Sequence, residues 1–74
     1  MPNLPDFETN AIITGEGYEW FYELKQKMVV RVALGAPVMA YERTEDDRDR
    51  IIVETKSGYM IYVPKDRIFF LKEH

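Results

Sequence analysis

Residues 51–71 read IIVETKSGYMIYVPKDRIFFL, and this stretch decides the fold that we predict. Two runs rich in β-branched and aromatic residues, Ile51–Thr55 and Tyr59–Val63, are joined by Lys56-Ser57-Gly58. Such side chains fit the pleated, half-buried surface of a strand, and a three-residue hairpin loop needs a residue with positive φ, which suits glycine. The stretch therefore predicts a β-hairpin with Gly58 at the left-handed position of its turn.

The alternation within these two runs predicts which side of the hairpin is buried. In the first strand Ile51, Val53 and Thr55 share one face, and we expect this face to pack on the core. In the second strand both faces are apolar, since Met60 and Tyr62 alternate with residues that are also apolar. Such a strand is either central between two packed layers or exposes one face to a partner.

The rest of the chain predicts a mainly β protein. Residues 1–10 contain two prolines and are expected to form an extended arm, followed by a single domain over residues 11–74. Residues 28–34 and 38–41 predict two further strands, separated by a Gly-Ala-Pro bend, and a polar loop over 42–50 leads into the hairpin.

The segment Tyr18–Lys27 (YEWFYELKQK) is compatible with two structures. As a strand, Tyr18, Trp20, Tyr22 and Leu24 alternate with charged residues, and only Phe21 breaks the pattern. The Gly15-Glu16-Gly17 turn would then pair this strand with Ile12–Thr14 in an extra hairpin. As a short helix, it has acids early and lysines late, which suits the helix dipole. We favour the strand, because aromatic residues suit strands, and the helix stays open.

From Met28 onward, the order of the predicted elements resembles an SH3-like small β-barrel, over residues 28–72. The resemblance is carried by Lys56-Ser57-Gly58 as the distal hairpin turn and by Tyr62–Ile68 (YVPKDRI) as a single turn before a short closing strand. It implies a small barrel with an N-terminal extension. It does not imply binding of proline-rich peptides, because the acidic Ala-Leu-Tyr-Asp-Tyr-like segment of peptide-binding SH3 domains is missing. Such barrels host many unrelated functions.

Composition narrows the class of protein. The chain has 74 residues and no cysteine, so we expect one small domain without a disulfide framework, a thiolate metal site or a cysteine nucleophile. No apolar run approaches the roughly 18 residues of a membrane helix, and the N-terminus lacks the pattern of a secretory signal. We therefore expect a cytoplasmic protein.

The residues that chemistry would need are not combined in a recognisable site. The only histidine is the last residue, His74, and Ser57 has no histidine partner to act as its base. Asp46, Asp47 and Asp49 could present oxygen ligands, but the glycine and glutamate of a calcium loop are missing and arginines neutralise the run. We predict no catalytic residue, no cofactor and no metal, and hence no enzyme.

Charge and aromatic residues instead predict a surface for a partner. The net charge is −3, and residues 1–24 contain five acids but neither lysine nor arginine. Tryptophan and tyrosine, which often supply much of the binding energy of interfaces, occur among these acids. The predicted partner-binding residues are Glu16, Tyr18, Glu19, Trp20, Tyr22, Glu23, Glu45, Asp46 and Asp47.

These features predict a non-enzymatic protein-binding module, a small acidic regulator or inhibitor whose partner has a basic surface. A phage-type modulator or a mimic of nucleic-acid charge would be a specific case. A homodimer would account for the same exposed aromatic residues, and a place for Trp20 in the core stays open.

The alternative is a β-barrel that binds single-stranded nucleic acid. Such proteins stack bases on aromatic side chains next to basic residues. The candidates for this surface are Tyr59, Tyr62, Phe69, Lys56, Lys65 and Arg67. The chain as a whole is acidic, whereas proteins that bind phosphate backbones usually show a clear basic excess, so this function ranks second.

Overall fold

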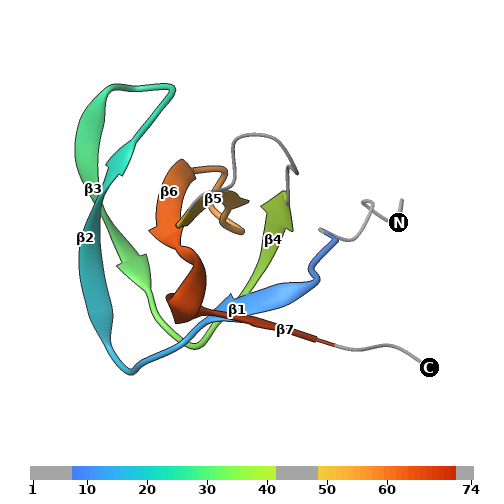
Figure 1. Ribbon diagram of the computed structural model, residues 1–74. Helices are drawn as coiled ribbons and strands as arrows, with labels where there is room; N and C mark the ends of the chain where they lie inside the picture. Colours follow the sequence, from blue (N-terminus) through green and yellow to red (C-terminus); the bar gives the residue numbers. More distant parts are fainter. Residues whose placement is uncertain (1–7, 42–48, 72–74) are drawn as a thin grey trace, which may run out of the picture.

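The computed structural model describes residues 8–41 and 49–71, which form antiparallel strands and one short 3-10 helix (Figure 1). The elements are β1 (Ala11–Ile13), β2 (Tyr18–Glu23), β3 (Met28–Ala33), β4 (Pro37–Tyr41), β5 (Arg50–Glu54), β6 (Met60–Pro64), the 3-10 helix η1 (Lys65–Arg67) and β7 (Ile68–Phe70). The predicted mainly β class is therefore confirmed.

The seven strands form one sheet in the order β3-β2-β6-β5-β4-β1-β7. Among the described strands, β3 and β7 lie at the two ends of this order and do not pair with each other. The sheet is strongly curved (Figure 1), but it is not closed by hydrogen bonds into a complete barrel.

The core lies inside the curve of the sheet. Strands point successive side chains to opposite faces, so every second residue of a strand turns inward. The buried apolar cluster consists of Ala11, Ile13, Val30, Val32, Val38, Ala40, Ile51, Val53, Ile61 and Val63. Because these side chains come from one face of the sheet, its other face is the outer surface of the molecule.

The hairpin predicted from residues 51–63 is present as β5 and β6. Ile51, Val53 and Thr55 are buried, as expected, and Gly58 closes the turn with φ of 91°. The Gly58 N–H donates to the carbonyl of Thr55 at 2.8 Å. On β6 the outward-facing Tyr62 is 42% exposed, so the alternative of a strand covered on both faces is wrong.

The predicted closing turn is also present. Pro64 ends β6, η1 follows, and β7 then pairs with β1 in the register Ile13↔Ile68. The Thr14 N–H donates to the carbonyl of Arg67 at 2.8 Å, which attaches the end of η1 to the chain just after β1.

Residues 18–27 form a strand and a turn, so the helical alternative is wrong. The predicted pairing of this strand with Ile12–Thr14 is wrong as well, because β2 forms its hairpin with β3 and meets β6 at Glu23↔Ile61. Strand β1 pairs instead with β4 and β7. Gly15 and Gly17, with φ of 127° and 80°, carry the chain from one part of the sheet to another and do not reverse it.

The predicted arm lies only partly within the described residues. Residues 1–7 are outside them, whereas Asn10, just before β1, is hydrogen-bonded to β4. Its N–H donates to the carbonyl of Val38 at 2.9 Å. Its side-chain Oδ1 accepts a hydrogen bond from the Ala40 N–H at 2.7 Å, and its Nδ2 donates to the Ala40 carbonyl at 3.1 Å. The side-chain amide thus continues the pairing that a strand backbone would make. Residues 42–48 of the predicted polar loop are also outside the described residues.

Candidate functional site

Three large aromatic side chains stand in a row on the outer face of β2. The alternation of this strand turns Tyr18, Trp20 and Tyr22 outward and Phe21 toward the core. The three outward side chains are 63%, 66% and 53% exposed. We call Tyr18, Trp20 and Tyr22 the aromatic row.

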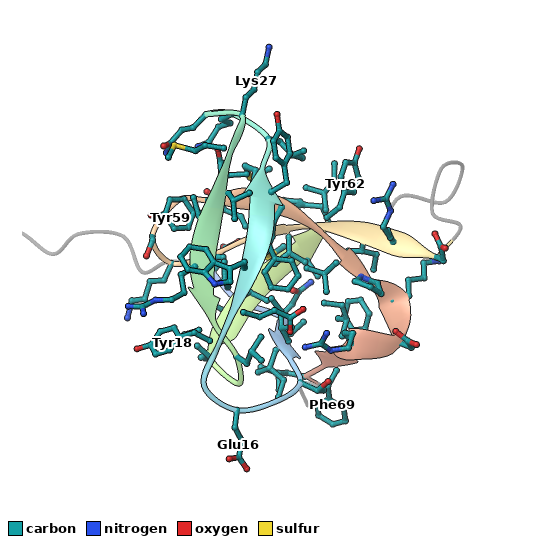
Figure 2. All side chains as sticks on the ribbon, turned by 90° about the vertical axis from the view of Figure 1, so that its left-hand side faces the viewer. Glu16, Tyr18, Lys27, Tyr59, Tyr62 and Phe69 are labelled. Atoms are coloured by element: carbon teal, nitrogen blue, oxygen red, sulfur yellow. The ribbon has the colours of Figure 1, made fainter. Side chains whose placement is uncertain are left out.

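Strand β3 supplies the second line of this surface. The register pairs Tyr18 with Ala33, Trp20 with Arg31 and Tyr22 with Val29. The guanidinium carbon of Arg31 lies 4.5 Å from the ring centroid of Tyr18, a cation–π geometry. In Figure 2 the hairpin faces the viewer, with Tyr18 near one end and Lys27 at the tip of its turn.

Glu19, predicted to flank the aromatic row, lies on the other face of β2. Its carboxylate accepts two hydrogen bonds from Arg67, at 2.8 Å from Nη2 and 3.3 Å from Nη1. These bonds hold the pKa of Glu19 below its usual value, against a smaller opposing effect of desolvation. Its role is to join β2 to η1.

Glu23, also a predicted partner-binding residue, is fully buried at the end of β2. Its Oε2 accepts a hydrogen bond from the Met60 N–H at 2.7 Å, and its Oε1 accepts one from the Gln26 N–H. The bond from Met60 is the main reason that the pKa of Glu23 is lowered. A buried carboxylate needs such donors, so Glu23 fixes the hairpin turn against β6 and is not available to a partner.

The other predicted acids do not surround the aromatic row either. Glu16 is exposed in the turn before β2, at the end of the hairpin opposite Lys27 (Figure 2). Glu45, Asp46 and Asp47 lie outside the described residues. The structure thus brings together Tyr18, Trp20 and Tyr22 from the predicted set, and separates Glu19 and Glu23 from them.

The charge exposed on the hairpin is positive. From Gly17 to Gly35 the exposed charged residues are Lys25, Lys27 and Arg31, while the two acids in this range are paired or buried as described above. Arg31 is not among the partner-binding residues predicted from the sequence. The signal that could have found it is the alternation of residues 28–34, which places Val29, Arg31 and Ala33 on one face, combined with hairpin pairing of the two strands.

A second contact between an arginine and an aromatic ring lies on the outer face of β5 and β6. The guanidinium carbon of Arg50 is 4.9 Å from the ring centroid of Tyr62. The other large hydrophobic side chains that are clearly exposed are Met28, Val29, Tyr41, Phe69, Phe70 and Leu71. The aromatic row differs from these in combining three neighbouring aromatic rings on one strand.

Among the described residues, histidine, aspartate and glutamate side chains form no group of three that could hold a metal ion. No helix in the part of the chain that the structure describes is long and apolar enough to span a membrane.

Comparison with known proteins does not identify the chain further. No protein-family model, curated protein or solved structure matches it significantly.

Proposed function

We propose that this protein is a non-enzymatic protein-binding module whose contact surface is the aromatic row together with Arg31. The observation that carries the proposal is the exposure of Tyr18, Trp20 and Tyr22, each more than half accessible on one face of one strand. Single exposed apolar residues are ordinary, whereas a contiguous apolar patch is typical of an interaction site.

A purely structural role is the competing explanation for these side chains. Cross-strand pairs such as Trp20 with Arg31 stabilise a hairpin by roughly 0.2–1 kcal/mol each. Such a pair does not require Trp20 to be 66% exposed. Burial of these exposed aromatic side chains against a partner would contribute more free energy than a cross-strand pair does, because each Å² of buried apolar surface contributes about 25 cal/mol.

The charge exposed on the hairpin bears on the charge of the partner. A basic partner would need acids around the aromatic row, and Glu19 and Glu23 do not lie there. With Lys25, Lys27 and Arg31 exposed on the hairpin, we propose a partner that is acidic where it meets this surface. A small regulator or inhibitor that acts by contact fits this surface.

The likeness of residues 28–72 to an SH3-like barrel also stays a proposal. It is supported by the β5–β6 turn and by η1 before β7.

Affinity capture from an extract of the source organism, with quantitative mass spectrometry, tests the proposed surface. Wild type is compared with Trp20→Ala and with Tyr62→Ala, a matched control because Tyr62 is an exposed aromatic residue on another strand. We expect at least one protein to be captured by wild type and Tyr62→Ala and lost with Trp20→Ala. If all three forms capture the same proteins, the aromatic row is not the contact surface.

Binding of single-stranded nucleic acid is the second candidate. The stacking of Arg31 on Tyr18, next to Trp20, is the observation that favours it, because bases stack on such rings beside cations. Fluorescence anisotropy of a labelled single-stranded oligonucleotide at low salt decides between the two. Salt-sensitive binding that Trp20→Ala abolishes would favour nucleic acid over a protein partner.

A further inference from the structure

Strand β3 has an edge that no other described strand pairs with. Among the described strands, β3 pairs with β2 alone and forms one end of the sheet. It lies at the outer margin of the molecule, beside β2 (Figure 1). A strand edge of this kind is a template on which another extended chain can pair.

The direction of the hydrogen bonds shows which residues of β3 face this edge. The Leu34 N–H donates to the carbonyl of Gly17 at 2.9 Å, in continuation of the β2–β3 register. Because bonded and non-bonded pairs alternate in an antiparallel ladder, Val32 and Val30 bond to β2. Val29, Arg31 and Ala33 therefore direct their N–H and C=O groups away from β2, toward the unpaired edge.

The same three residues carry their side chains on the face of the aromatic row. Arg31 lies between Val29, which is 54% exposed, and Ala33, which is also exposed. The tip of the hairpin adds Lys25 and Lys27, so an incoming strand would meet Arg31 near the middle of the edge and the two lysines at one end. An extended segment whose alternate residues are acidic matches both the hydrogen-bonding period and this charge.

We propose that the partner contributes an extended acidic segment that pairs antiparallel with the free edge of β3. This inference rests on the proposed protein-binding function and specifies its mode. The segment would exchange backbone hydrogen bonds with Val29 and Arg31. Its acidic side chains would lie on the outer face, beside Arg31 and Lys27, and next to the aromatic row.

Two other occupants fit this edge less well. A nucleic-acid backbone offers phosphate acceptors but no regular series of donors, so the outward carbonyls of Val29 and Arg31 would stay unpaired. A second copy of the chain would bring a second set of Lys25, Lys27 and Arg31 to the same edge, and like charges across a strand pair are unfavourable.

Synthetic peptides with alternating Glu and Val test the mode of binding. Trp20 is the only tryptophan of the chain, so its fluorescence reports binding by peptides that lack tryptophan. In an antiparallel pair, the peptide residues on the face of Arg31 turn their N–H groups toward β3. We expect N-methylation of the Glu residues to raise Kd by about tenfold or more, through loss of hydrogen bonds, and N-methylation of the Val residues to leave it unchanged.

Variants of the protein complete the test. Val29→Pro removes an N–H that points to the free edge and is not used in the β2–β3 ladder, so the fold is expected to persist while peptide binding weakens. Arg31→Glu should weaken the acidic peptide and strengthen its Lys-Val counterpart. Circular dichroism and light scattering confirm that each variant is folded and monomeric.

The outcomes separate this inference from the proposed function. If N-methylation of Glu and of Val changes the peptide Kd equally, or if the change is greater at Val, the edge pairing is overturned. Loss of peptide binding in Trp20→Ala would in that case still support the aromatic row as the contact surface. Absence of binding by any peptide would overturn the inference and leave the protein-capture experiment to decide the proposed function. Dimerisation through this edge, or preference for single-stranded DNA over the acidic peptide, would also overturn it.

Discussion

Arg67 and Glu19 form a two-point ion pair that connects the closing turn to the second strand. The Nη2–Oε1 distance is 2.8 Å and the Nη1–Oε2 distance is 3.3 Å, and Nη2 also donates to the carbonyl of Thr14 at 3.2 Å. Only the tip of β2 is hydrogen-bonded to β6, at Glu23↔Ile61. The ion pair therefore helps to hold the hairpin that carries the aromatic row against the rest of the sheet.

Loss of this ion pair should destabilise the fold by a modest amount. Both side chains are partly exposed, so we expect Arg67→Ala to lower the free energy of unfolding by about 1 kcal/mol. Arg67→Lys, which keeps the charge but not the fork, should recover only part of the loss. Urea unfolding of Arg67→Ala, of Glu19→Ala and of the double variant measures the coupling energy between the two side chains. If the effects of the two single variants add up in the double variant, the ion pair contributes nothing to stability.

Acid should weaken the fold through Glu19 and Glu23. The pKa of each carboxyl is lowered in the folded state, for Glu19 mainly by Arg67 and for Glu23 mainly by the Met60 N–H. A lowered pKa means that the stabilisation is complete above the unfolded value of about 4.3 and is lost as the pH falls through the folded value. Urea midpoints should thus stay level from pH 7 to about pH 5 and fall below that. Glu19→Gln should reduce this fall of the urea midpoint in acid. Glu16→Gln, in the exposed turn, is the control and should leave the fall unchanged. If Glu19→Gln also leaves it unchanged, the role of the ion pair is contradicted.

Much of the hairpin and of the closing turn could be predicted because local sequence determines them. Gly58 and the β-branched runs on either side of it specify the β5–β6 hairpin, and Pro64 ends β6 through its own geometry. The partner of β2 could not be predicted in this way. Alternation indicates which residues share a face, but it does not say which strand lies beside them.

The site was predicted only in part, for a related physical reason. The sequence indicates that Tyr18, Trp20 and Tyr22 share a face, and the structure shows that this face is outward. Glu23 can be buried because two backbone donors, those of Gln26 and Met60, satisfy its carboxylate, and Met60 is distant in the sequence. No local pattern in the sequence reports such a contact, so the sequence alone predicts a surface position for an acid that the structure places in the interior.

The two glycines before β2 should differ in their tolerance of a side chain. Gly15 has φ of 127°, far from the left-handed region at about 50–70°, and a Cβ there would lie 2.8 Å from Leu34 Cδ1. Gly17 has φ of 80°, with nothing within 4 Å of an added Cβ. We expect Gly17→Ala to cost about 1 kcal/mol and Gly15→Ala about 2 kcal/mol or more, measured by urea unfolding. Equal costs would show that neither the φ of Gly15 nor its contact with Leu34 restricts this position more than Gly17.

Asn10 should contribute to stability although it precedes the first strand. Asn10→Ala would leave the N–H and C=O of the buried Ala40 without the side-chain partners that they have now. The expected loss is about 1–3 kcal/mol in the free energy of unfolding. Asn10→Asp keeps the acceptor for the Ala40 N–H but not the donor to the Ala40 carbonyl. Its free energy of unfolding should therefore lie between those of wild type and Asn10→Ala. An effect of Asn10→Ala no larger than that of an average surface substitution, about 0.5 kcal/mol, would show that this pairing is unimportant.

The central claim is that the outer face of the β2–β3 hairpin touches the partner, and site-specific photocrosslinking in cells tests it most directly. A benzophenone amino acid replaces Tyr22 in one form and Tyr41 in the other, since both tyrosines are exposed but lie on different strands. We expect a crosslinked protein partner from position 22 that is absent or much weaker from position 41. Crosslinks to the same protein at equal yield from both positions, or to nucleic acid alone, would contradict the claim.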